Sequence, residues 1–331
     1  MMVDNVSKPE GSPDPQKVVE EINRKAGRNM PQAVATAALL IVVIVGCLLI
    51  SLQTFVVLVI VFMILALWEL RVDFATVGLH IPVITLWLCS VGMLLATFYF
   101  PRHVEAMAVS SIVAFLAVVV MSTMRVTLGS HLSLAVAGKL AASDPGERDG
   151  LGPSSDAEPP VHSRMSNVAV SVFSLMYVPL LAGSIVLSLT FHGHPVAHAI
   201  ILVFLPALSD TGGLFAGAWF GRHKLSPRIS PKKSVEGLIG SMLFAVIGAV
   251  AVFASTYAHL WSTMWWVPVV MGVMVGIVGT FGDLCASMLK RDIGIKDMGH
   301  LLKGHGGVMD RVDSILLAAP FLTVLLWMTG M

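Results

Sequence analysis

The segment from Ile295 to Asp313, IKDMGHLLKGHGGVMDRVD, gathers charge and glycine near the end of a chain that is otherwise strongly apolar. Asp310 and Asp313 are three residues apart, so both carboxylates lie on one face of a predicted helix. Asp283, at the end of an earlier apolar run, adds a third carboxylate from another helix. Magnesium binds one or two carboxylates together with waters and phosphate oxygens. The three aspartates therefore predict a metal–phosphate site, and the alternative is helix capping with an ion pair to Arg311.

Cations and glycines accompany these acids. Lys290 follows Asp283 by seven residues, which is about two turns along one helix face. The stretch GHGG, which contains His305, Gly306 and Gly307, precedes a predicted helix start, where backbone N–H groups can bind phosphate. A simple turn also needs glycine, and His305 can equally be a structural hydrogen-bonding residue, so both alternatives remain open here.

A second polar stretch runs from Leu205 to Gly237. Asp210 lies deep inside its apolar run, and acids at such depth usually face a water-filled cavity because an ionised carboxylate in lipid is costly. Pairing with a neighbouring hydroxyl or a lysine is the alternative. Gly212, Gly213 and Gly217 allow either close helix packing or close approach of a ligand.

The loop that follows is rich in cations, and its two prolines stiffen the backbone that carries them. Such a loop often marks the cytoplasmic side or an anionic-lipid patch. Beside a buried acid, it also fits a clamp for polyphosphate. The cations are Lys224, Arg228, Lys232 and Lys233.

The elements that must position these groups are membrane helices. Hydrophobic residues make up 56% of the 331 residues, charged residues make up 12%, and the mean hydropathy is +0.84. A spanning helix needs about 20 apolar residues, which predicts an all-α polytopic membrane protein with nine spans. The polar stretch SDTGG interrupts the sixth. The spans are 33–50, 52–70, 80–99, 104–124, 168–190, 196–220, 235–257, 265–286 and 314–330.

The distribution of charge predicts the orientation of these spans. Basic residues are retained on the cytoplasmic side, and an N-terminus in the cytoplasm places all of the 21 Lys and Arg residues except Arg102 on that side. The composition predicts four regions. They are a mobile cytoplasmic tail (1–32), N-terminal transmembrane helices (33–137), a flexible or regulatory cytoplasmic linker (138–167) and a C-terminal catalytic transmembrane domain (168–331).

At this point the sequence resembles the phosphatidate cytidylyltransferases, also called CDP-diacylglycerol synthases. The likeness is strong over residues 200–314, where SDTGG and SPKKSVEG are similar to a second shared stretch of the family. Lys303 departs from the family pattern, which has Pro or Gly there. The signature residues are Ser287, Lys290, Arg291, Lys296, Asp297, Gly299, Leu302, His305, Gly306, Gly307, Asp310, Arg311 and Asp313.

The resemblance implies transfer of CMP from CTP to phosphatidic acid at the cytoplasmic side of the inner (plasma) membrane. It implies Mg2+, with K+ nearby, and a homodimer in the lipid bilayer, with no nucleic acid as partner. Asp283, Asp310 and Asp313 would bind the metal, and Ser209 and Asp210 would line the deeper end of the cavity. Lys290 would act in catalysis. The other expected substrate-binding residues are Lys232, Lys233, Arg291, Lys296, Asp297, His305, Gly306, Gly307 and Arg311.

Two other functions fit part of this pattern. One is a CTP-dependent lipid kinase, or a cytidylyltransferase that acts on another lipid phosphate. The other is an ion-coupled transporter in which Asp210 and Asp283 bind the cation. The glycine-rich stretch and the clustered cations favour the enzyme.

Overall fold

The computed structural model describes residues 30–124, 164–191, 193–227, 229–295, 298–299 and 307–331, without the side chains of 30–34, 231 and 232. The predicted tail and most of the predicted linker lie outside these residues. The N-terminal helices are α2 (Met30–Ile50), α3 (Leu52–Thr76), α4 (Val83–Tyr99) and α5 (His103–Thr123).

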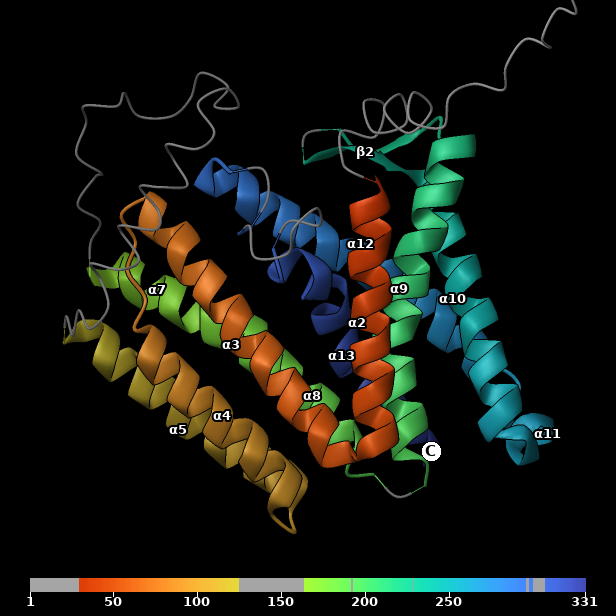
Figure 1. The fold of residues 1–331 in the computed structure, drawn as a ribbon, viewed down its shortest axis with the longest axis horizontal. Coiled ribbons are helices and arrows are strands. Elements are labelled where there is room, and N and C mark those ends of the chain that lie inside the picture. Colours follow the sequence, from red (N-terminus) through yellow and green to blue (C-terminus); the bar gives the residue numbers. More distant parts are fainter. Residues whose placement is uncertain (1–29, 125–163, 192, 228, 296–297, 300–306) are drawn as a thin grey trace, which may run out of the picture.

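The C-terminal part follows with a short hairpin among its helices. Figure 1 shows α3, α4 and α5 on one side of the molecule and α9 and α10 on the other. The elements are α7 (Arg164–Leu175), η1 (Met176–Leu180), α8 (Leu181–Ser188), α9 (Pro195–Phe220), β1 (Lys224–Ser226), β2 (Ser230–Ser234), α10 (Val235–Thr256), η2 (Ala258–Leu260), α11 (Trp261–Met264), α12 (Val267–Ile293) and α13 (Met309–Thr329).

The predicted all-α architecture is confirmed. Each of the nine predicted runs coincides with a described helical segment. Among the described residues, seven helices are long and apolar enough to cross a membrane, and Arg164–Ser188 counts as one of them. The apolar helices Ala35–Ile50 and Val83–Tyr99 are shorter. Pro179 lies inside the Arg164–Ser188 helix, at a π-helical turn, which accommodates the hydrogen bond that proline cannot donate.

The polar stretch SDTGG interrupts the apolar run of the sixth span but not its helix, because α9 continues through it without a break. Its glycines serve helix packing. A Cβ atom on Gly212 would lie 2.6 Å from the carbonyl oxygen of Gly240, and one on Gly237 would lie 3.1 Å from that of Gly213. Small residues let two helix backbones approach closely. Of the two predicted roles for Gly212 and Gly213, the structure therefore shows packing of α9 on α10.

Two further segments that were predicted as loops have regular structure. Helix α3 extends to Thr76, so most of the predicted loop 71–79 is helical and buried. The loop 221–234 contains the antiparallel hairpin of β1 and β2. Glu236 holds this hairpin to the start of α10, because its carboxylate accepts hydrogen bonds from the backbone N–H groups of Arg222 and His223.

The two parts of the chain pack against each other. Helix α10 packs against both α9 and α12, and α12 packs along α13. From the N-terminal part, α5 contacts α7, α4 contacts α8, and α3 contacts α12 and α13. The hairpin and the C-terminus lie at opposite ends of the molecule (Figure 1). The end of α12 and the start of α13 are thus bordered by helices from both parts.

Candidate functional site

The predicted aspartates lie on three packed helices. Asp210 is on α9, Asp283 on α12, and Asp310 and Asp313 are in the first two turns of α13. Helices α12 and α13 approach closely here, since a Cβ atom on Gly282 would lie 2.8 Å from the carbonyl oxygen of Asp313. We call these four aspartates, with Lys233 and Lys290, the acidic site.

Two of the aspartates form ion pairs with lysines from other elements. Lys233 Nζ lies 2.8 Å from Asp283 Oδ2 and donates to the carbonyl oxygen of Thr280 at 2.9 Å. Lys290 Nζ lies 2.8 Å from Asp310 Oδ1, and this second pair is more buried than the first. Lys233 lies in strand β2, so the hairpin brings a cation to Asp283 of α12.

Ser314 joins the other two aspartates. Its hydroxyl donates to Asp210 Oδ2 at 2.7 Å, and its backbone N–H donates to Asp313 Oδ1 at the same distance. Asp313 is buried, and its carboxylate interacts electrostatically with those of Asp283, Asp210 and Asp310. The hydroxyl partner predicted as the alternative for Asp210 is therefore present. Asp313 nevertheless lies close enough to the other three carboxyl groups to interact with their charges.

The predicted three-aspartate metal set is not assembled as a cage. Within the described part of the chain, no three His, Cys, Asp or Glu side chains are placed to hold a metal ion together. Asp283 and Asp310 are instead paired with lysines. The donors are all carboxylate oxygens, which suit a hard cation bound by one or two of them with water and phosphate. Magnesium binding stays a prediction.

The remaining predicted residues are distributed around this site. Ser209 is fully buried, and its hydroxyl has no hydrogen-bond partner among the described residues. Arg291 is exposed in the last turn of α12, and Gly307 is buried against Met298 and a carboxylate of α3. Arg311 is half-buried in the first turn of α13. Outside the described part lie Lys296, Asp297, Lys303, His305 and Gly306, and likewise the side chain of Lys232.

Sequence reasoning missed three buried charged residues on α3, namely Glu69, Arg71 and Asp73. Glu69 accepts hydrogen bonds from the backbone N–H groups of Val308 and Met309. Asp73 accepts one from Gly299 and interacts electrostatically with residues of the acidic site. The signal was the stretch WELRVDF, because charged residues at alternate positions beside an apolar run usually have a function.

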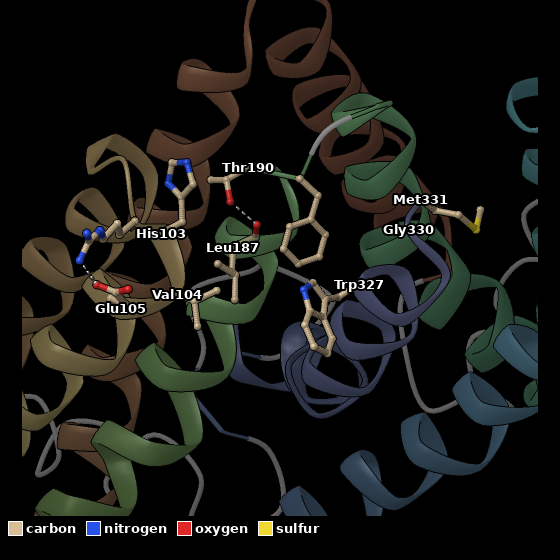
Figure 2. Close-up of a pocket in the computed structure, with 10 residues that line it drawn as sticks. His103, Val104, Glu105, Leu187, Thr190, Trp327, Gly330 and Met331 are labelled. Atoms are coloured by element: carbon tan, nitrogen blue, oxygen red, sulfur yellow. Dashed lines mark hydrogen bonds and ion pairs between the residues drawn. The ribbon is translucent and has the colours of Figure 1, made fainter.

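A separate cavity of about 440 Å³ lies at the other end of α13 (Figure 2). Its lining includes Arg102 and Glu105, which form an ion pair of 3.1 Å, and Trp327. Asp310 and Trp327 are near opposite ends of one helix, about 25 Å apart at 1.5 Å per residue. This cavity therefore does not belong to the acidic site.

Comparison with known proteins identifies the family. A family model described as "Cytidylyltransferase family" matches residues 31–329. The chain belongs to the cytidylyltransferase family. This confirms the resemblance that the signature residues predicted. It also extends the match to the N-terminal helices, where residue types alone showed only an apolar helical pattern.

Curated relatives of this cytidylyltransferase-family chain are named phosphatidate cytidylyltransferase. The Mycobacterium leprae protein is 36% identical over 163 residues, which cover 49% of this chain and 51% of the relative. The Pseudomonas aeruginosa protein is 49% identical over 138 residues, or 41% of this chain and 50% of the relative. The chain thus spans about half the length of the curated relatives it matches.

Proposed function

We propose that the chain transfers CMP from CTP to phosphatidic acid and forms CDP-diacylglycerol and pyrophosphate. The observation that carries this proposal is the acidic site, where carboxylates and lysines meet at one end of an apolar helical bundle. Membership of the cytidylyltransferase family and the names of the relatives support the same reaction. A lipid with a charged phosphate and apolar tails suits a polar site bordered by membrane helices.

The reaction needs positioning and neutralisation of charge more than covalent help. An oxygen of the lipid phosphate attacks the α-phosphorus of CTP, and the bond to the β-phosphate oxygen breaks, so its electron pair leaves with pyrophosphate. Lys233, Lys290 and Arg291 would offset negative charge on these phosphates. An ammonium group has three donors, and their partners on Asp283 and Asp310 hold two of these cations in defined positions.

The carboxylates would hold magnesium. Asp283, Asp310 and Asp313 are the proposed ligands, with water and phosphate oxygens completing the shell, and K+ is proposed nearby. A bound Mg2+ would stabilise negative charge that develops on the phosphates. Asp210 and Ser209 would form the deeper polar wall of the site.

The proposed setting is the inner (plasma) membrane, with nine spans, the N-terminus in the cytoplasm and the acidic site at the cytoplasmic side. The charge distribution supports this orientation, since Arg102 is the one Lys or Arg of the sequence that it places outside. The lipid would enter with its tails still in the bilayer. A homodimer is proposed from the family resemblance.

Turnover by the purified full chain tests the proposal. With CTP and phosphatidic acid, we expect CDP-diacylglycerol and pyrophosphate in equal amounts, and only when magnesium is present. Labelled CTP offered with other lipid phosphates would reveal a different acceptor. Transfer of the γ-phosphate would instead indicate a lipid kinase. Cation flux in sealed vesicles without cytidine chemistry would indicate a transporter, and each of these results would contradict the proposal.

A further inference from the structure

The start of α13 has no cap of its own. Val308 occupies the N-cap position and makes no side-chain capping hydrogen bond. The first N–H groups of a helix have no partner within the helix, and Gly307, Val308 and Met309 are all buried here. Donors that are buried in this way need an acceptor from elsewhere in the fold.

Glu69 provides that acceptor from α3. Its two carboxylate oxygens accept from the backbone N–H groups of Val308 and Met309, each at 2.9 Å. Glu69 is 2% exposed, so water competes little for these bonds. A carboxylate at a helix N-terminus also interacts favourably with the helix dipole. These two N–H groups therefore have a protein partner, which is relevant because a helix start can otherwise bind phosphate.

The backbone on either side of residues 300–306 lies directly against this carboxylate. Gly299 has a φ angle of +65°, and a Cβ atom there would lie 2.5 Å from the carboxyl carbon of Glu69. A Cβ atom on Gly307 would lie 2.7 Å from Glu69 Oε2. One turn further along α3, Asp73 accepts from the N–H of Gly299. Contact with Glu69 thus favours glycine at both positions, together with the positive φ angle at Gly299 and the even closer Met298 carbonyl group at Gly307.

We infer that Glu69 is a positioning residue that fixes the start of α13 and, through it, the aspartates of the acidic site. Met309, whose N–H it binds, directly precedes Asp310. Asp310 in turn pairs with Lys290 and accepts from the N–H of Met298. The N-terminal helices therefore contribute to the geometry of the site as well as to membrane anchoring. The effect on turnover rests on the proposed function, whereas the structural effect does not.

Hydrogen exchange on the full chain in detergent tests this inference. Glu69→Gln keeps the size of the side chain but replaces one acceptor oxygen by a donor group, and Glu69→Ala removes both acceptors. We expect exchange of the peptide 307–312 to rise at least tenfold in both variants, while peptides from α10 keep their wild-type protection. Glu105→Gln, on the exposed Arg102 pair, is the matched control and should change neither peptide.

Turnover is measured on the same samples. We expect Glu69→Gln to lower kcat more than tenfold and Glu69→Asp to recover part of the loss, because a shorter carboxylate can still accept one N–H. Unchanged exchange at 307–312 in both variants would overturn the inference. Loss of protection in α10 as well would also overturn it, since Glu69 would then support the whole fold. A wild-type chain without turnover would refute the proposed function. The exchange result would still decide whether Glu69 positions the start of α13.

Discussion

Single residues of the acidic site are held from several directions. Asp310 binds Lys290 through one oxygen and the N–H of Met298 through the other. Asp313 and Asp210 share Ser314 as a donor. Carboxylates fixed in this way need little reorganisation when substrate charge arrives, which is the condition for effective electrostatic catalysis.

Neutralising either aspartate of α13 should remove most of the activity. We expect Asp310→Asn and Asp313→Asn each to lower kcat by about 100-fold or more, as loss of one preorganised electrostatic group commonly does. The measurement is magnesium-dependent formation of CDP-diacylglycerol. Asp292→Asn, on the exposed surface of α12, is the control. Wild-type rates in both α13 variants would refute their assignment.

The buried pair of Lys290 and Asp310 should matter for stability. Lys290→Met leaves a buried carboxylate without its cation, a change that costs about 3–5 kcal/mol, so the melting temperature in detergent should fall. Adding Asp310→Leu should recover only part of the stability, because the buried N–H of Met298 then loses its acceptor, and it should not restore turnover. Arg102→Met, at an exposed pair, should cost less than about 1 kcal/mol. Equal melting temperatures for Lys290→Met and wild type would contradict this.

The sequence was a good guide to which residues lie at the acidic site and a poor guide to which of them form pairs. Spacing alone places Asp310 and Asp313 on one face of a helix. It cannot show that Lys233 reaches Asp283, because that contact depends on the hairpin fold. Glu69 lies inside the predicted span 52–70, but it was missed because its partners are backbone N–H groups, which have no residue-type signature.

Among the elements, α9 and α10 pack closely against each other beside the site. Gly212 and Gly213 of α9 face Gly240, Ser241 and Gly237 of α10. Asp210 lies two residues before Gly212, so this contact holds the segment of α9 that carries it. A change in helix separation should therefore affect both stability and the geometry of the acidic site.

Adding one methyl group at this contact should be harmful. Gly212→Ala would place a Cβ atom 2.6 Å from Gly240 O and from Phe244, and overpacking of this kind costs about 1–3 kcal/mol. Gly92→Ala in α4 meets nothing within 4 Å and should be neutral or stabilising, since Ala exceeds Gly in helix propensity by about 1 kcal/mol. Thermal unfolding of the two variants makes the comparison. Equal melting temperatures for Gly212→Ala and Gly92→Ala would contradict this prediction, because they would show that α9 and α10 can move apart without cost.

Helix positions were predictable because a membrane span is a long apolar run. The ends of the helices at polar segments were harder to predict than their positions. Helix α3 continues through RVDFAT, and α12 continues to Ile293. There the helix is held by buried contacts with other helices, and hydropathy carries no information about them. The hairpin was missed for a similar reason, because its strands are short and rich in Lys and Ser.

For the whole molecule, the acidic site and the hairpin lie at one end and the cavity that contains Arg102 lies at the other. The charge distribution predicts that the first end faces the cytoplasm. Which end faces which compartment determines whether CTP can reach the acidic site in the cell.

Thiol labelling checks this orientation. In a chain without its three native cysteines, Arg222→Cys beside the hairpin should react with a membrane-impermeant reagent only from the cytoplasmic side. Thr263→Cys on α11, also exposed, should react only from the opposite side. The reverse pattern would invert the predicted topology.

The bond between Glu69 and Met309 also has a consequence for biogenesis. Its two partners are 240 positions apart, and a ribosome that adds about 5–20 residues per second needs roughly 12–48 seconds to make the intervening chain. During that interval Glu69 lacks the N–H partners on α13 and must contact other groups. The acidic site therefore cannot reach its mature geometry until α13 has been synthesised and inserted, and factors that shield polar groups in unfinished membrane proteins should associate with α3 in this interval.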